Sequence, residues 1–208
     1  MNRQQINSII GLVIIALLFV VSSILVQNYI DEISTYLDFG FYGMIVYVIL
    51  TILSIVVAPV SAMPLMPIAS ALWGWVATGI LSIIGWTIGA WIAFVLARKY
   101  GVSLVSKLVD LKKIQVFEKL IPEKHLFLGI VIFRMVIPVD GLSYFLGLFS
   151  KIKLRTYLLA TIIGITPFAF AFAYLGTVPV YYQLIALVIG TTLFVIGWLA
   201  YSKKKKDR

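Results

Sequence analysis

The feature that most constrains this chain is a stretch from Phe39 to Ala97 in which no side chain is charged. As a helix this stretch would extend about 88 Å, near three crossings of a hydrocarbon core about 30 Å thick. Two further uncharged runs occupy residues 4–30 and 156–202. With 62% hydrophobic and 12% charged residues, the 208-residue chain is too apolar for a soluble globular or disordered protein. We therefore expect an all-α polytopic membrane protein that forms a single transmembrane domain, residues 1–208.

Prolines divide the uncharged runs into two kinds of segment. Pro59, Pro64 and Pro67 cannot all lie inside one regular helix, because each lacks an amide donor and clashes with the preceding turn. We interpret 41–74 as a re-entrant helical hairpin with these prolines at its tip, because broken backbone at membrane depth must be covered by protein or a wet cavity. The interrupted stretch 126–150 predicts a second hairpin. About four full transmembrane helices complete the fold, and we place them at residues 9–28, 75–97, 156–176 and 180–201.

The distribution of cations predicts the orientation. The formal net charge of +9 in a membrane protein points to the cytoplasmic face rather than to nucleic acid. Residues 98–125 alternate lysines with leucines and valines and predict a basic cytoplasmic amphipathic connector; a plain solvated connector is the alternative. The basic tail 203–208 and both termini are then cytoplasmic, and the acidic loop 29–40 lies outside. The run near the N-terminus is interpreted as a span rather than a cleaved signal peptide.

Two blocks of sequence resemble each other. PLMPIASALWG (64–74) and IPVDGLSYFLG (137–147) each begin near a proline and end at a glycine, and each precedes a span rich in small residues. The predicted topology inserts the two hairpins from opposite sides, which makes an inverted repeat of the kind that transporters use. The first span carries a face of small residues at four-residue spacing, for which packing inside the bundle is favoured over dimerisation. These residues are Gly85, Gly89, Ala93 and Ala97.

Arg134 and Asp140 are the charges expected to lie within the membrane. Such groups are costly there and usually mark a pathway. The planar guanidinium of Arg134 suits a phosphate, and Asp140 is a candidate proton carrier; a buried ion pair between the two is the alternative. Other candidates for the polar cleft are Pro138, Gly141, Ser143 and Tyr144 in the second hairpin and Pro59, Ser61, Pro64, Pro67 and Ser70 in the first.

Enzymatic chemistry is not expected. The chain has no cysteine and a single histidine, so it offers neither a metal cluster nor a nucleophile with its base. No Gly-x-x-x-x-Gly-Lys loop is present, so ATP is not expected to supply energy. We expect no cofactor.

Four segments together resemble the VTT-domain superfamily, which includes the DedA and SNARE-associated Golgi protein families. They are PVSAMPLMPIASALWG (59–74), GWTIGAWIAFVLARKYG (85–101), FRMVIPVDGLSYFLGLF (133–149) and ATIIGITPFAFAFAYLG (160–176). The resemblance implies a core over 41–176, with repeats at about 41–101 and 126–176. Arg134, Pro138 and Gly147 match the family's hairpin motif. The first hairpin lacks the usual DedA acid, and Asp140-Gly141 replaces a second arginine, so the chain resembles the non-DedA branch more closely.

The resemblance implies movement of lipids or lipid-linked phosphates between leaflets, with proton coupling suspected in DedA members. Together with Arg134, it leads us to expect a transporter or scramblase of phosphate-bearing lipids in the plasma membrane of a prokaryote. A proton- or ion-coupled carrier of small solutes and a membrane scaffold without flux are the alternatives.

Overall fold

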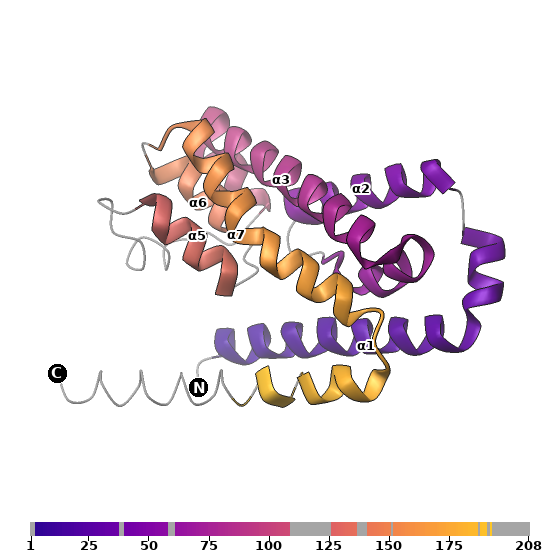
Figure 1. The fold of residues 1–208 in the computed structure, drawn as a ribbon. Helices are drawn as coiled ribbons and strands as arrows, with labels where there is room; N and C mark the ends of the chain where they lie inside the picture. Colours follow the sequence, from indigo (N-terminus) through magenta and orange to yellow (C-terminus); the bar gives the residue numbers. More distant parts are fainter. Residues whose placement is uncertain are drawn as a thin grey trace.

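The computed structural model describes residues 3–37, 40–57, 61–108, 126–136, 141–150, 152–186, 188–190 and 192. All regular structure in these segments is helical (Figure 1). The elements are α1 (Arg3–Leu37), α2 (Gly40–Val56), the 3-10 turn η1 (Met63–Leu65), α3 (Met66–Leu108), α5 (Leu126–Val136), α6 (Gly141–Phe149) and α7 (Leu154–Leu175).

Three stretches are long and apolar enough to cross a membrane, namely Val13–Glu32, Met63–Val102 and Leu154–Leu175. The first and third stretches correspond to the predicted spans 9–28 and 156–176. The second, Met63–Val102, contains the predicted span 75–97 and also the end of the first predicted hairpin. The fourth predicted span, 180–201, is described only in its first half, which contains the apolar helix Val180–Gly190. Most of the predicted basic connector and the tail 203–208 lie outside the described residues.

Two glycines divide α3 into three helical pieces. Gly74 has φ 79° and ψ 155°, and Gly101 has φ 67° and ψ −159°. A residue with a Cβ rarely adopts such positive φ values, which explains why glycine stands at both breaks. The first piece, Met66–Trp73, is about 12 Å long and is far too short to cross the hydrocarbon core. The second piece runs through residues 75–100, from Trp75 to Tyr100.

Two of the prolines in the predicted first hairpin lie at the starts of helices. Pro64 lies in η1, and Pro67 is the second residue of α3, where the missing amide proton has no intrahelical partner to lose. The Ser61 hydroxyl accepts a hydrogen bond from the Met63 amide at 3.3 Å and helps to begin η1. Pro59 lies outside the described residues.

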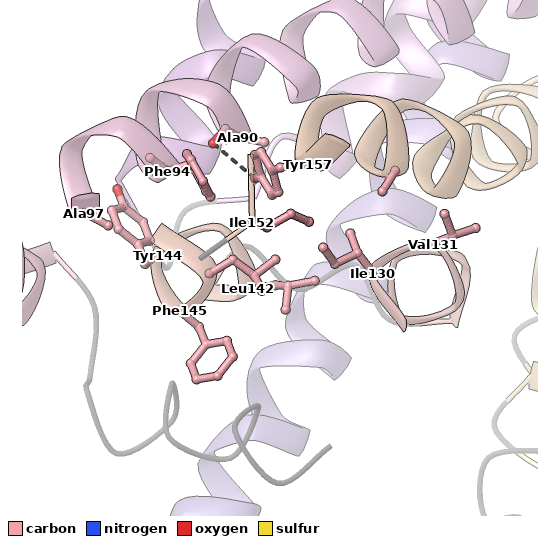
Figure 2. Packing of buried hydrophobic residues seen from close by; sticks show 13 residues of the cluster. Ala90, Phe94, Ala97, Ile130, Val131, Leu142, Tyr144, Phe145, Ile152 and Tyr157 are labelled. Atoms are coloured by element: carbon pink, nitrogen blue, oxygen red, sulfur yellow. Dashed lines mark hydrogen bonds between the residues drawn. The ribbon is translucent and has the colours of Figure 1, made fainter. Parts of the chain in front are cut away.

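The core is formed around the short helix α6 (Figure 2). Every residue from Leu142 to Gly147 is buried, so this part of α6 is covered on every side, whereas Phe149 at its end is exposed. Its surroundings come from the end of α3, from α5 and from the start of α7. At nine residues α6 is about 13 Å long, so it too cannot cross the hydrocarbon core.

The small-residue face of α3 lies inside the bundle. Gly85 and Gly89 face α2, where an added Cβ would come within 2.9 Å of the Thr51 Cβ and 2.8 Å of the Ile55 Cβ, respectively. Ala93 and Ala97 are buried in the core cluster around α6. An added Cβ at Gly147 of α6 would lie 2.6 Å from the Cβ of Ala97. Small residues therefore let α3 approach α2 and α6 closely.

The N-terminal helix is held by polar contacts with the chain that follows α7. The Gln183 amide nitrogen donates to the Ser23 hydroxyl at 2.8 Å and to the Val178 carbonyl at 2.9 Å. Gln27 donates to the same carbonyl at 2.9 Å. These contacts place α1 beside the helix that begins at Val180 (Figure 1).

Candidate functional site

Arg134 is buried, with 6% of its surface exposed, in the last turn of α5. A cation at this end of a helix interacts favourably with the helix dipole. The backbone of α7 comes very close to the arginine, because Gly164 stands where any side chain would collide. An added Cβ at Gly164 would lie 2.8 Å from the Arg134 Cβ and 2.9 Å from the Val131 carbonyl oxygen. Gly164 thus allows α7 to cover the aliphatic part of the arginine.

The guanidinium is held by hydroxyl groups from two other helices. Its Nη2 donates to the Ser143 Oγ of α6 at 2.7 Å and to the Tyr157 Oη of α7 at 3.1 Å. Hydroxyl oxygens are uncharged, so they accept hydrogen bonds from the guanidinium but do not neutralise its positive charge. An arginine held in this way keeps its ability to attract an anion.

Tyr157 is itself fixed on both sides. Its ring stacks on Phe94 of α3, with centroids 4.3 Å apart and an interplanar angle of 14° (Figure 2). Its hydroxyl donates to the Ala90 carbonyl at 3.2 Å while it accepts from Arg134. Tyr157 therefore links the arginine to α3 and is a positioning residue for it.

Two polar atoms at this site have no hydrogen-bond partner among the residues that the structure describes. They are Arg134 Nε and Thr161 Oγ1. Thr161 is fully buried on α7, one turn after Tyr157 and three residues before Gly164, so it shares the face that contacts Arg134. A guanidinium N–H can only donate, so the missing partner of Nε is an acceptor, such as an anionic oxygen.

Tyr144 and Gly141 lie on the same short helix as Ser143. Tyr144 is fully buried, and its hydroxyl donates to the Val56 carbonyl at the end of α2, at 2.5 Å. That carbonyl has no partner within its own helix, so Tyr144 connects α6 to the end of α2. Gly141 is the first residue of α6. Pro138 and Asp140 lie outside the described residues.

The candidates from the predicted first hairpin form a separate group. Ser61, Pro64 and Pro67 shape the start of α3, and Ser70 is buried in its first piece. A Cβ added at Gly176, at the end of α7, would come within 2.9 Å of the Pro67 Cα. No hydrogen bond between described residues joins this group to Arg134.

Sequence reasoning missed Tyr157, Thr161 and Gly164, which form one face of α7 against the arginine. The spacing of four and three residues is typical of a helix face, but nothing in it points to Arg134. From the sequence, Arg98 belongs to the basic connector 98–125. In the structure its guanidinium donates to the Ser150 carbonyl at 2.6 Å and the Ile152 carbonyl at 2.9 Å and lies 4.3 Å from the Phe94 ring centroid.

The described residues contain no group of three or more acidic, histidine or cysteine side chains that could hold a metal ion.

Comparison with known proteins gives one match. No curated protein and no solved structure matches the chain. The family model of the VTT domain matches residues 59–178, which include α3, α5, α6 and α7 together with Arg134, Ser143, Tyr157 and Thr161. Because this match covers more than half of the sequence and falls on the apolar helices that surround the arginine, the chain belongs to the VTT-domain family of membrane proteins.

Proposed function

We propose that this protein moves phosphate-bearing lipids between the two leaflets of a membrane, with Arg134 binding the phosphate. The observation that carries the proposal is the buried guanidinium, whose described hydrogen-bond partners are neutral hydroxyls and whose Nε has none among the described residues. Leaving such a donor unsatisfied inside a membrane is costly, so the arrangement favours a ligand that supplies the acceptor. The proposal includes no enzymatic step.

Phosphate fits these donors better than an uncharged ligand does. A guanidinium presents parallel N–H groups that match two phosphate oxygens, and hydrogen bonds between charged groups are the stronger ones. The Thr161 hydroxyl, free among the described residues, offers a further donor on the same side of α7. The lipid tails stay in the bilayer while the headgroup passes between the hairpins.

The inverted repeat forms part of the proposal, and a recurrent contact supports it. Gly89 of α3 faces the Ile52 carbonyl and the Ile55 Cβ of α2, and Gly164 of α7 faces the Val131 carbonyl and the Arg134 Cβ of α5. In both helix pairs a glycine thus meets the carbonyl of one residue and the Cβ of the residue three positions later. Arg134 corresponds to Ile55 in this comparison, so the charge belongs to one repeat only.

The direct test is lipid exchange by purified protein in sealed vesicles, measured with a fluorescent phospholipid that dithionite quenches in the outer leaflet. We expect Arg134→Ala to abolish protein-dependent exchange and Arg134→Lys to retain part of it. Thr161→Val, which keeps the shape of the side chain, should lower the rate roughly tenfold, as expected for about 1.5 kcal/mol lost with a hydrogen bond to a charged ligand. The exposed Arg155 on α7 provides the control Arg155→Ala.

The ion-pair alternative predicts a different pattern. If Arg134 serves only to neutralise Asp140, Arg134→Ala lowers thermal stability and the double variant Arg134→Ala with Asp140→Ala restores it. Normal exchange by a restored double variant would contradict the proposal. Asp140→Asn separately tests proton coupling, because loss of the pH dependence of exchange in a folded variant assigns the proton to this carboxyl.

Two other functions are distinguished by the same vesicles. A small-solute carrier would move solute across a sealed membrane without exchanging lipid, and a scaffold would do neither. We place both termini in the cytoplasm and the protein in the plasma membrane of a prokaryote, as the cation distribution favours.

A further inference from the structure

A second group of buried polar side chains lies between α2 and the two pieces of α3 that meet at Gly74. The Tyr47 hydroxyl is 2.7 Å from the Ser82 Oγ, and Ser82 donates its own proton to the Thr78 carbonyl at 2.7 Å, so Tyr47 is the donor to Ser82. The Tyr47 ring also meets the Trp73 ring edge-on, with centroids 6.0 Å apart. Tyr47 therefore connects the short first piece of α3 to the long second piece.

Three polar atoms of this group have no partner among the described residues, and they flank the break in α3. They are Ser70 Oγ and Trp73 Nε1 before Gly74 and Thr78 Oγ1 after it. Ser70 and Thr78 are 2% and 0% exposed, respectively. Ser70 and Trp73 are three residues apart in one helical piece and so share a face.

Some hydroxyls near this group bond within their own helices, whereas Thr87 Oγ1 of α3, like the three atoms of this group, has no partner among the described residues. Thr51, Ser54 and Ser82 each donate to a carbonyl of their own helix, at 2.8, 2.8 and 2.7 Å. Thr78 lies four residues after Gly74, whose ψ of 155° turns its carbonyl out of the helical direction, and Thr78 Oγ1 has no partner among the described residues. The indole N–H of Trp73 projects from a ring and reaches no carbonyl of its own turn.

The chemistry of the three groups restricts the ligand. An indole N–H only donates, so the ligand must present an acceptor oxygen. The residues in this contact network are all uncharged, so the site differs from Arg134 and suits an uncharged acceptor rather than a phosphate. The uncharged acceptors that glycerolipids carry at the edge of the hydrocarbon region are their ester carbonyls.

We infer that Ser70, Trp73 and Thr78 form a binding site for the ester carbonyls of a glycerolipid. The site is separate from Arg134 and would hold the glycerol region of a lipid, which extends the proposed function but does not depend on leaflet exchange. Gly74 divides the two pieces of α3 that carry the donors, with Ser70 and Trp73 before the break and Thr78 after it.

The test compares two lipids that differ only in these carbonyls. Purified full-length protein in detergent is titrated with short-chain diester phosphatidylcholine and with its diether analogue, and thermal stabilisation gives the apparent affinity for each. We expect the wild-type protein to prefer the diester. Trp73→Phe keeps the ring beside Tyr47 and removes the N–H, and Thr78→Val keeps the shape and removes the hydroxyl. Each should reduce the preference roughly two- to tenfold, as expected for one neutral hydrogen bond.

Matched controls act on similar residues elsewhere. Trp91→Phe changes an exposed tryptophan of α3, and Thr166→Val removes a hydroxyl that already bonds the Ile162 carbonyl at 2.7 Å. Both should keep the diester preference. If Trp73→Phe does not fold, the test rests on Thr78. The inference then requires that Thr78→Val reduces the diester preference and that Thr78→Ser, which restores a hydroxyl, recovers it.

The results separate this inference from the proposed function. Equal stabilisation of the wild-type protein by diester and diether lipids overturns the inference, as does a preference that both variants retain. A diester preference in a protein that exchanges no lipid would support the inference and contradict the proposed function. Lipid exchange by a protein that shows no diester preference would support the proposed function and contradict this inference.

Discussion

Gly164 lies so close to Arg134 that a methyl group at position 164 would come within 2.8 Å of the arginine Cβ. The same methyl group would meet the Val131 carbonyl at 2.9 Å, and a backbone atom cannot move aside as a flexible side chain can. The distance between α5 and α7 is therefore set by a residue without a side chain. This approach brings the guanidinium within reach of Ser143 and Tyr157.

Gly164→Ala should destabilise the protein by separating α5 from α7. We expect a loss of about 1–3 kcal/mol, the usual cost of overpacking a core, together with reduced lipid exchange. Thermal unfolding in detergent measures the first effect. Gly11→Ala is the control, because no atom lies within 4 Å of its added Cβ and alanine favours helix. A Gly164→Ala variant as stable as the control would show that the helices do not depend on this contact.

Tyr157→Phe should separate positioning from folding. The phenyl ring keeps its stack on Phe94, but the bonds to Arg134 and to the Ala90 carbonyl are lost. We expect stability to fall by about 1 kcal/mol and exchange to fall further, because the guanidinium loses a partner that orients it. The exposed Tyr174 of α7 gives the control Tyr174→Phe. If Tyr157→Phe and Tyr174→Phe change stability and exchange equally, Tyr157 does not position Arg134.

Arg98→Lys should loosen the junction between α3 and the start of α7. The guanidinium donates to two carbonyls, of Ser150 and Ile152, and covers the Phe94 ring. An ammonium cannot reproduce this planar arrangement, so we expect a loss of about 1–2 kcal/mol in thermal stability. The neighbouring Lys99→Arg is the control. Because Phe94 also stacks on Tyr157, exchange should slow as well.

Single cysteines test the orientation, and the chain contains none of its own. Cysteines at Lys99 and Lys204 should react with an impermeant thiol reagent only from the cytoplasmic side, and one at Glu32 only from outside. The physical reason is the retention of positive charge on the cytoplasmic side during insertion. Labelling of positions 32 and 99 from the same side would contradict both the orientation and the inverted repeat.

The sequence by itself determined the class of protein and its family. Uncharged apolar runs of this length cannot all be buried in a water-soluble fold of this size, so the composition predicted a helical membrane protein. The apolar helices of the structure confirm this prediction. The VTT resemblance rested on local proline and glycine motifs, and the family match at residues 59–178 confirms it. Pro64 and Pro67 predicted a break in regular helix, because proline restricts its own backbone, but only the structure shows that they lie at the starts of η1 and α3.

Only the tertiary structure decided which groups surround the arginine. Sequence reasoning placed Ser143 near Arg134 but could not find Tyr157, 23 residues away, or assign the Tyr144 hydroxyl to the Val56 carbonyl, 88 residues away. Helical periodicity tells which residues share a face, but not which helix that face meets. That choice depends on where backbones approach closely enough, and here glycines at positions 89, 147 and 164 decide it by the side chains they lack.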